Sequence, residues 1–342
     1  MKEKMKAAVF EGVGNLAIKE VDTPKIIKED EVIIEVDMCA ICGTDIHITA
    51  NPPGYEAAPG TVLGHEFAGR VAEVGRAVKD LKPGDRVVAN PNDYCGHCRY
   101  CKMNLPNFCE NMVQMGVKSD GAFAEYVKTT EKCVFKVPDG LSAKEAALAE
   151  PMSCALNGLE QIRVNPGESV LVCGAGAIGL LHIELLKESG AYPIIVSEPV
   201  ETRRKMALKV GADFAVDPTK EDLNAFVLQK TGMGVDYAID VVGSQFGACL
   251  DNVRNGGTVL LFGLNERARM DMQQSEVTTK QVRVYGTWIA NATFPKVIQI
   301  LGSRKLDLES LVTHVYPLEK LPEALELLRG GEGIKAVIDM KL

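Results

Sequence analysis

Long hydrophobic runs are absent from this sequence. The longest apolar stretch, VLVCGAGAIGLL at residues 170–181, is rich in glycine and shorter than the roughly 20 residues that a transmembrane helix needs. Near the N-terminus, the segment AAVF is too short for the core of a secretory signal, and the charged residue Glu11 follows it at once. We therefore expect a soluble, cytoplasmic protein without a membrane partner.

An excess of positive charge is also missing. The 38 lysines and arginines are outnumbered by 46 acidic residues, and the basic residues are scattered rather than clustered, which argues against a nucleic-acid partner. Ten cysteines in 342 residues are too few for a disulfide scaffold. With 46% apolar residues and no internal repeat, the chain has the length and composition of two ordinary globular domains.

The first third of the sequence is typical of a β-rich domain. Short segments with β-branched residues are separated by glycine and proline, which predicts a barrel-like or sandwich domain. The predicted strands are 32–39, 66–75, 85–90 and 122–128.

The pattern changes at Ser142, a predicted N-cap with Glu145 as its capping-box partner, at the start of a helix over 142–150. From Ser169 onward strands and helices alternate, which predicts an α/β domain with a Rossmann-type, doubly wound parallel sheet. Its predicted strands are 169–173, 192–198, 235–243 and 256–264, and its helices are 177–190 and 202–211.

Four cysteines form the most informative cluster of the sequence. They have the spacing C-x2-C-x2-C-x7-C within residues 95–109, and four thiolates so close together can enclose one zinc ion in a tetrahedral shell. Such a shell leaves no open position, so we expect the ion to stabilise a loop and not to catalyse; disulfides or unpaired thiols are the alternative interpretation. The ligands are Cys95, Cys98, Cys101 and Cys109.

A glycine-rich turn lies between the strand at 169–173 and the following helix. Gly174, Gly176 and Gly179 form G-x-G-x-x-G, with Ala177 and Ile178 between them, and in this context the motif predicts that NAD binds with its pyrophosphate at the helix N-terminus. Glu198 ends the next strand, where a carboxylate can bind both ribose hydroxyls and repel the 2′-phosphate of NADP. The alternative interpretation is an acidic residue that only favours the start of the next helix.

Three consecutive basic residues at 203–205 favour NADP instead. Arg203 and its two neighbours could hold a 2′-phosphate, but Glu198 should lie nearer the ribose, so NAD is the preferred cofactor.

A second, open metal site is predicted from residues far apart in the sequence. Cys42, His65 and Glu150 offer one sulfur, one imidazole and one carboxylate, which leaves a fourth position for water or substrate, as in catalytic zinc sites. Glu66 is a possible further or alternating ligand or a base, and Asp45 could fix the tautomer of His65. Each residue also has an ordinary structural interpretation, and Cys39 with Cys42 could instead be a redox pair.

Together these motifs resemble the zinc-containing medium-chain dehydrogenase/reductase family, which includes alcohol and polyol dehydrogenases. The resemblance extends over nearly the whole chain and rests on CGTDIH at 42–47, GHEFAG at 64–69, the cysteine lobe at 95–109, EP at 150–151 and GAGAIG at 174–179. It implies a GroES-like catalytic domain formed by residues 1–149 and 288–342, with a Rossmann domain at 150–287 inserted between the two parts.

The resemblance also implies roles for individual residues. Cys42, His65 and Glu150 match the catalytic zinc ligands, and Glu66 matches a further ligand of the sorbitol dehydrogenase branch. Thr44 matches the hydroxyl that receives the substrate proton, and His47 matches the end of a relay that passes through the nicotinamide ribose to solvent. The positions near the nicotinamide are Val242, Phe262 and Ile289.

Within the family, the EPMSC form at residues 150–154 resembles polyol and sugar-phosphate alcohol dehydrogenases, although Asn157 replaces a histidine that polyol members often have. We therefore predict that the protein uses zinc and NAD to oxidise a secondary hydroxyl group of a sugar alcohol reversibly to a ketone. L-threonine 3-dehydrogenase and sugar-phosphate dehydrogenase activity are alternatives, and a non-catalytic redox sensor that binds zinc and NAD is an alternative of another class. The small-molecule substrate is the expected partner, and relatives suggest a homotetramer or homodimer, with edge pairing near 282–285.

Overall fold

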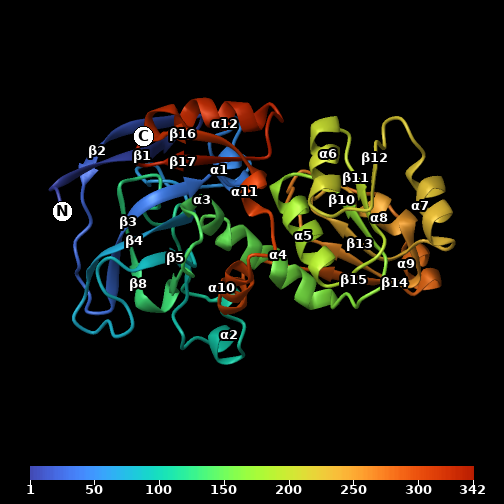
Figure 1. Cartoon of the computed structure of the whole chain (residues 1–342), viewed down its shortest axis with the longest axis horizontal. Coiled ribbons are helices and arrows are strands. Elements are labelled where there is room, and N and C mark those ends of the chain that lie inside the picture. The colour runs from blue at the N-terminus through green and yellow to red at the C-terminus, as the bar shows by residue number, and fades with distance from the viewer. The chain divides into compact units, whose positions relative to one another are not determined.

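The computed structural model describes residues 1–342 and divides into two compact units (Figure 1). Unit 1 comprises residues 1–153, 290–304 and 308–342, and unit 2 comprises residues 154–289 and 305–307. The sequence-based expectation places the boundaries at 149/150 and 287/288 and assigns residues 305–307 to the other domain. Among the helices, none combines the length and the apolar character required to cross a bilayer.

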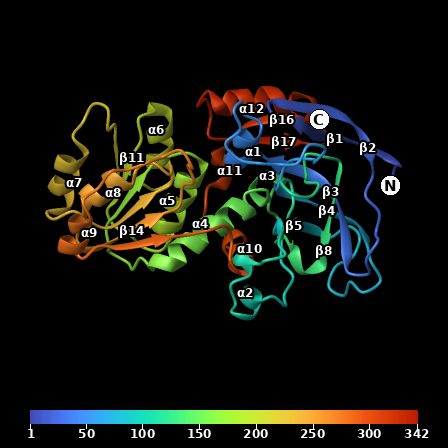
Figure 2. The same ribbon diagram turned by 180° about the vertical axis from the view of Figure 1, so that it is seen from behind.

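Unit 1 is built on a seven-stranded sheet in which β3 and β4 form the most extensive pair (Figure 2). The sheet order is β16-β17-β3-β4-β5-β9, with β8 pairing along β3, and every pair except β16 with β17 is antiparallel. Phe67 and Phe123 are among the largest fully buried side chains of its core. The strands are β3 (Glu31–Ala40), β4 (Glu66–Val74), β5 (Arg86–Ala89), β8 (Tyr126–Thr130), β9 (Val134–Lys136), β16 (Val312–Pro317) and β17 (Lys335–Asp339).

An N-terminal hairpin, absent from the sequence prediction, covers part of this core. Strands β1 (Lys4–Gly12) and β2 (Asn15–Asp22) pair with each other, and isolated bridges join Ala7 to Ala124 and Val9 to Val62. The helices of unit 1 are α1 (Gly43–Ile48), α2 (Arg99–Lys102), α3 (Ala143–Ala146), α10 (Phe294–Ser303), α11 (Leu308–Leu311) and α12 (Leu321–Arg329), with short 3-10 turns at Pro106–Phe108, Glu131–Cys133 and Leu318–Lys320.

Two elements differ from their predicted form. The segment 122–125 is not part of β8. Ala122 N and Phe123 N donate to the carbonyls of Gly64 and Leu63 at 2.8 and 2.9 Å, and Ala124 bridges to Ala7 of β1. The helix expected over 142–150 is two helices, α3 and α4 (Ala149–Ile162). The predicted capping box is present, because Ser142 Oγ accepts from Glu145 N at 3.2 Å and Glu145 Oε2 accepts from Ser142 N at 2.8 Å.

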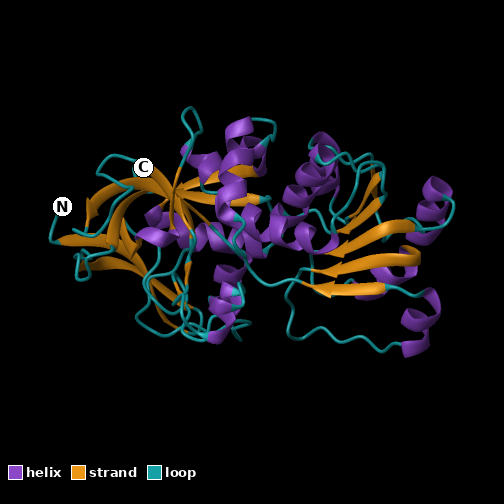
Figure 3. Ribbon diagram, turned by 90° about the horizontal axis from the view of Figure 1, so that it is seen from below, coloured by secondary structure: helices purple, strands orange, loops and turns teal.

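Unit 2 is the predicted doubly wound domain. Its six strands are all parallel in the order β12-β11-β10-β13-β14-β15, which is the 3-2-1-4-5-6 order of Rossmann folds, and helices cover both faces (Figure 3). Because parallel strands are buried on both faces, β10 reads VLVC without a polar residue. The strands are β10 (Val170–Cys173), β11 (Ile194–Ser197), β12 (Phe214–Val216), β13 (Val235–Asp240), β14 (Val253–Leu261) and β15 (Arg283–Gly286), and the helices after α4 are α5 (Ala177–Glu188), α6 (Glu201–Lys209), α7 (Leu223–Thr231), α8 (Phe246–Asn252) and α9 (Gln274–Lys280).

Candidate metal and dinucleotide sites

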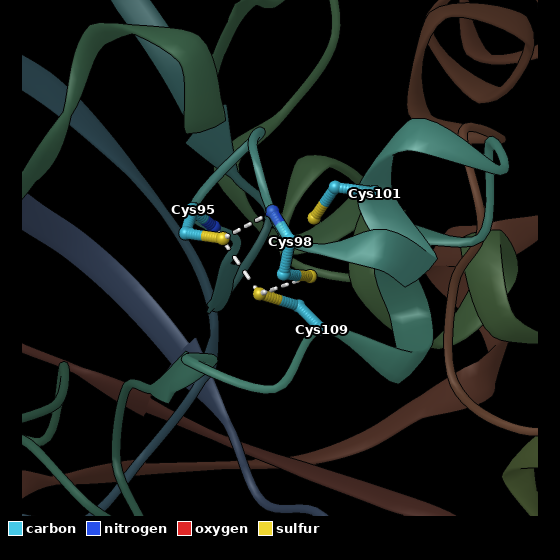
Figure 4. A group of neighbouring side chains, drawn as sticks. All are labelled: Cys95, Cys98, Cys101 and Cys109. Atoms are coloured by element: carbon cyan, nitrogen blue, oxygen red, sulfur yellow. Dashed lines mark hydrogen bonds between the residues drawn. The ribbon is translucent and has the colours of Figure 1, made fainter.

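The four-cysteine lobe is a loop held at its base by the two-residue strands β6 (Asn92–Asp93) and β7 (Val113–Gln114). The thiols of Cys95, Cys98, Cys101 and Cys109 all lie within 4.8 Å of one another, and Figure 4 shows them pointing toward a common centre.

The sulfur geometry fits a zinc ion. Tetrahedral zinc with bonds of about 2.3 Å to sulfur separates its ligand sulfurs by about 3.8 Å. Cys98 Sγ and Cys109 Sγ are 3.9 Å apart, whereas a disulfide would require about 2.05 Å. A backbone N–H of His97 lowers the pKa of Cys95 to about 5, while burial raises the pKa of Cys101 to about 12. The thiols thus differ in their readiness to ionise, and a bound cation would favour the thiolate in all four.

Cys42 lies at the start of helix α1, in extended backbone as its N-cap. Asp45 Oδ2 accepts from the Cys42 backbone N–H at 2.9 Å, and Cys42 Sγ is 3.6 Å from Thr44 Oγ1. Asp45 is fully buried, and this burial raises the pKa of its carboxyl. The short helix therefore presents a thiol and a hydroxyl side by side.

His65 and Glu66 stand at the start of β4. The turn before them requires glycine, because Gly64 has a φ of 91° and a Cβ there would lie 2.7 Å from the backbone nitrogen of Phe123. His65 Nδ1 is 3.8 Å from Asp45 Oδ1, which is within ion-pair range but too long for a hydrogen bond. Asp45 thus lies beside the ring without a hydrogen bond to it, and neither Asp45 Oδ1 nor His65 Nδ1 has a hydrogen-bond partner.

Three of the predicted catalytic metal ligands converge. Ligand atoms of Cys42, His65 and Glu66 lie within 4.8 Å of one another. Glu150, at the start of α4, is outside this group but is 8% exposed and close enough to act on the same residues electrostatically. Burial lowers the pKa of His65, but Cys42, Asp45 and Glu150 together raise it well above its ordinary value, so this pocket attracts positive charge.

A buried lysine, which the sequence does not reveal, completes this pocket. Lys335 of β17 is 4% exposed and forms an ion pair with Glu66. Burial lowers its pKa, but Glu66, Cys42 and Glu150 raise it overall. Lys335 lies 269 positions from Glu66 in the sequence, so no local motif could have indicated this pair.

Thr44 and His47 occupy the exposed side of α1. Thr44 is half-buried and His47 is exposed. Gly54 donates its N–H to the His47 carbonyl at 3.0 Å, and a Cβ on Gly54 would come within 3.2 Å of His47 Nδ1. The imidazole is therefore close to the backbone of a neighbouring loop but open to solvent.

The glycine-rich turn of unit 2 has the geometry of a pyrophosphate loop. Gly174 has a φ of 109°, and a Cβ on it would lie 2.7 Å from Val242 Cγ2. A Cβ on Gly179 would come within 2.2 Å of the Gly174 carbonyl, so only glycine lets α5 start this close to the turn. Gly176 is the N-cap of α5 and faces open space, with Ala177 and Ile178 forming the first turn.

Glu198, after β11, is connected to that turn. Its Oε2 accepts from Ala175 N at 2.8 Å and its Oε1 accepts from Val200 N at 2.9 Å. Of the neighbouring basic residues, Arg204 donates to the Glu198 carbonyl and pairs with Asp217 at 3.3 Å, while Lys205 pairs with Glu201. Arg203 is half-buried on the first turn of α6.

The three positions assigned to the nicotinamide all follow strand ends. Val242 follows β13, Phe262 follows β14 and Ile289 follows β15, so they lie at the carboxyl edge of the sheet, where ligands of such folds bind. Asp240, missed in the sequence, holds the first of these turns: its carboxylate accepts from Val242 N, Gly243 N and Gln245 N at 2.7–2.9 Å.

Comparison with known proteins identifies the family. Residues 28–139 match the alcohol dehydrogenase GroES-like domain, and residues 177–303 match the zinc-binding dehydrogenase domain. An L-threonine 3-dehydrogenase of Thermococcus kodakarensis is 38% identical over 348 residues, covering 98% of each chain. The chain belongs to the zinc-containing medium-chain alcohol and polyol dehydrogenases.

Two further members illustrate the range of this family. The sorbitol dehydrogenase of Bacillus subtilis is 33% identical, with 95% of this chain and 93% of the relative covered. A zinc-binding dehydrogenase of Sinorhizobium meliloti, crystallised with NADP, superimposes with a TM-score of 0.92 at 30% identity, covering 99% and 100% of the chains. The predicted fold, the oxidoreductase class, and zinc and a nicotinamide dinucleotide as cofactors are thereby confirmed for this dehydrogenase.

Proposed function

We propose that this dehydrogenase interconverts a secondary alcohol of a sugar alcohol and its ketone with NAD, at a zinc ion held in unit 1. The observation that carries the proposal is the convergence of Cys42, His65 and Glu66 within 4.8 Å, beside Glu150. One sulfur, one imidazole and a carboxylate are the donor set of a zinc site that keeps a position for substrate.

Two carboxylates compete for the third ligand position. Glu66 is nearer to Cys42 and His65, but its charge is already balanced by Lys335. We propose that Glu150 completes the ligand set and that Glu66 exchanges between the metal and the lysine. The zinc contents of Glu150→Gln and Glu66→Gln test this assignment, because only Glu150→Gln should lose the ion of this site. If Glu150→Gln kept the ion and Glu66→Gln lost it, Glu66 would be the permanent ligand instead.

The proposed proton path uses the exposed side of α1. A bound zinc ion would lower the pKa of the substrate hydroxyl, and the hydride would pass from the carbon that bears this hydroxyl to NAD. Thr44, whose hydroxyl is 3.6 Å from Cys42 Sγ, is the proposed proton acceptor beside the ligands. His47 is the proposed exit to solvent, because it is exposed and an imidazole ring can accept a proton on one nitrogen and donate one from the other. Replacing His47 with Asn should lower turnover most at low pH, where bulk base is scarce.

We propose NAD rather than NADP as the cofactor. Both Glu198 oxygens accept a backbone N–H near the turn and keep lone pairs for ribose hydroxyls. Arg204 is occupied by backbone carbonyls and by Asp217, and Lys205 pairs with Glu201, so these two cations are already engaged within the protein. Glu198→Ala should weaken the binding of NAD and reduce the preference of the enzyme for NAD over NADP. Faster turnover of the native enzyme with NADP than with NAD would contradict the proposal.

The substrate class is tested by comparing turnover with sorbitol, xylitol and arabinitol against turnover with L-threonine and phosphorylated sugar alcohols. L-threonine is the second candidate, because the relative at 38% identity is a threonine dehydrogenase. A kcat/KM for threonine more than about tenfold above that of every polyol would replace the first proposal with the second.

Metal content separates the enzyme from the redox-sensor alternative. Two zinc ions per chain with NAD-dependent turnover support the dehydrogenase, whereas one ion and no turnover with any of these alcohols support a sensor that uses Cys39 and Cys42.

We further propose assembly through β15. This strand pairs with β14 on one side only, all four of its residues are exposed, and Val284 and Tyr285 are about 40% accessible. An open, partly apolar edge favours pairing with a second copy. A dimer or tetramer in light scattering that dissociates on Val284→Pro would support this interface.

A further inference from the structure

Asn157 occupies an unusual environment in unit 2. It lies on α4, is 3% exposed, and its Nδ2 is within hydrogen-bond distance of three oxygens of one segment. The distances are 2.7 Å to the Ile289 carbonyl, 3.1 Å to Thr287 Oγ1 and 3.4 Å to the Trp288 carbonyl. On the other side, Gln161 Nε2 lies 3.4 Å from Asn157 Oδ1.

This network determines the orientation of the amide. Two of the three neighbouring oxygens are carbonyls and can only accept, so the NH2 side of Asn157 must face the segment. Gln161 donates to the remaining oxygen, which supports the same orientation. A buried amide with two donor hydrogens thus holds the 287–289 segment at successive residues.

The segment needs such support. Ile289 has a φ of 43°, in the left-handed region that a β-branched residue adopts only at a cost. Strained backbone of this kind persists where the surroundings hold it, and it is common at binding sites. Asn157 binds the carbonyl of this very residue with the shortest of its three contacts.

We infer that Asn157 is a positioning residue that holds the Thr287–Ile289 segment in the conformation that receives the nicotinamide half of the cofactor. This inference rests on the proposed NAD-dependent function and on the family resemblance, which places Ile289 near the nicotinamide. The segment follows the end of β15, as Val242 and Phe262 follow β13 and β14, so it lies along the same edge of the sheet. The adenosine and pyrophosphate contacts proposed for Glu198 and Gly176 come from other loops and do not involve Asn157.

The test compares NADH with ADP-ribose, which lacks the nicotinamide. In Asn157→Asp the side chain keeps its shape but loses both donors and places a negative charge beside carbonyl oxygens. We expect the Kd of NADH to rise at least about tenfold, equivalent to about 1.4 kcal/mol, while the Kd of ADP-ribose stays within about twofold. The shift of NADH fluorescence on binding, which reports the nicotinamide environment, should shrink in the same variant.

Two further variants complete the experiment. Asn252→Asp is the matched control, because Asn252 is an equally buried asparagine of unit 2 whose amide donates to Ala248 instead; it should leave both affinities unchanged. Asn157→His retains a ring N–H donor and should recover most of the NADH affinity. Asn157→Ser replaces the aspartate variant if that protein does not fold, with the same expectation.

Three results would overturn the inference. They are a folded Asn157→Asp protein with native NADH affinity, a parallel loss of NADH and ADP-ribose, and an Asn157→His variant no better than the aspartate variant. A native protein that binds NADH normally but turns over no alcohol would instead count against the proposed function.

Discussion

The two candidate metal sites are both in unit 1, but they are built in opposite ways. The four-cysteine lobe takes all its ligands from residues 95–109, and all of them are thiols. The second site takes Cys42 from the N-cap of α1, and His65 and Glu66 from the start of β4. Lys335 of β17 supplies a counter-charge. The first can be recognised from spacing in the sequence, whereas the second exists only once the sheet has formed.

This contrast accounts for what each ion can do. Four thiolates of one loop can satisfy a metal completely, and the loop then depends on it for its shape. A site assembled from separate elements depends on the fold instead, so the protein can leave a ligand position unfilled and still hold the residues in place. The following predictions test this division, from the largest effect to the smallest.

Replacing Cys42 with Ser should affect chemistry and little else. We expect kcat/KM to fall at least about a thousandfold, or about 4 kcal/mol, because the open site loses its sulfur ligand. NADH affinity and the unfolding temperature should stay close to native. Cys39→Ala, at a buried cysteine three residues away, is the control and should remain active. Native activity of Cys42→Ser in chelator-treated buffer would show that catalysis does not use this site.

Replacing Lys335 with Met should instead affect the fold that supports the open site. Glu66 would remain buried without its cation, and breaking a buried pair costs about 3–5 kcal/mol. Urea unfolding measures this loss, and the double variant Lys335→Met/Glu66→Gln should recover much of it. Lys136→Met, which breaks the pair of an exposed lysine with Asp85, is the matched control and should change stability little. Equal effects of the two lysine variants would mean that the buried pair has no special role.

Replacing Cys109 with Ser should show the opposite pattern to Cys42→Ser. The lobe loses its ion, so we expect the unfolding temperature to fall by about 5–10 °C and the zinc content to fall by one ion. Turnover per folded molecule at 25 °C should remain within a few-fold of native. If this variant lost turnover as completely as Cys42→Ser, the distinction between the two ions would fail.

Replacing Asp45 with Asn should give the smallest effect. Asp45 accepts from Cys42 N and faces His65 without being a proposed ligand, and such supporting groups are worth about 10–100-fold in activity or metal affinity. Asn111→Ala removes a hydrogen-bond donor to Cys95 in the four-cysteine lobe. This variant should leave turnover unchanged and serves as the comparison. Activity lost equally in both variants would argue against a specific role for Asp45.

The sequence was sufficient wherever the signal was local. The cysteine spacing, the glycine turn at 174–179, the capping box at Ser142 and the alternation that produces the parallel sheet all depend on residues near each other. It was insufficient where the fold brings distant residues together. Lys335 has no motif, and the predicted strand at 122–128 starts late because its first residues lie against the Gly64 turn.

Other residues carried a signal that could have been used. Asp240 lies inside the predicted strand 235–243, but the observed β13 ends at it, and an acidic residue shortly before Gly243 is a common acceptor of backbone N–H groups in a turn. Asn157 stood out only as a departure from the family, and its contacts with residues 287–289 required the structure.

The most direct test of the open metal site is a crystal structure with anomalous difference maps at the zinc edge. Two peaks per chain are expected, one among the four cysteines of the lobe and one bonded to Cys42, His65 and a single carboxylate, with a water or alcohol as the fourth ligand. A second peak that is missing in active crystals, or that is enclosed by four permanent protein ligands, would contradict the account.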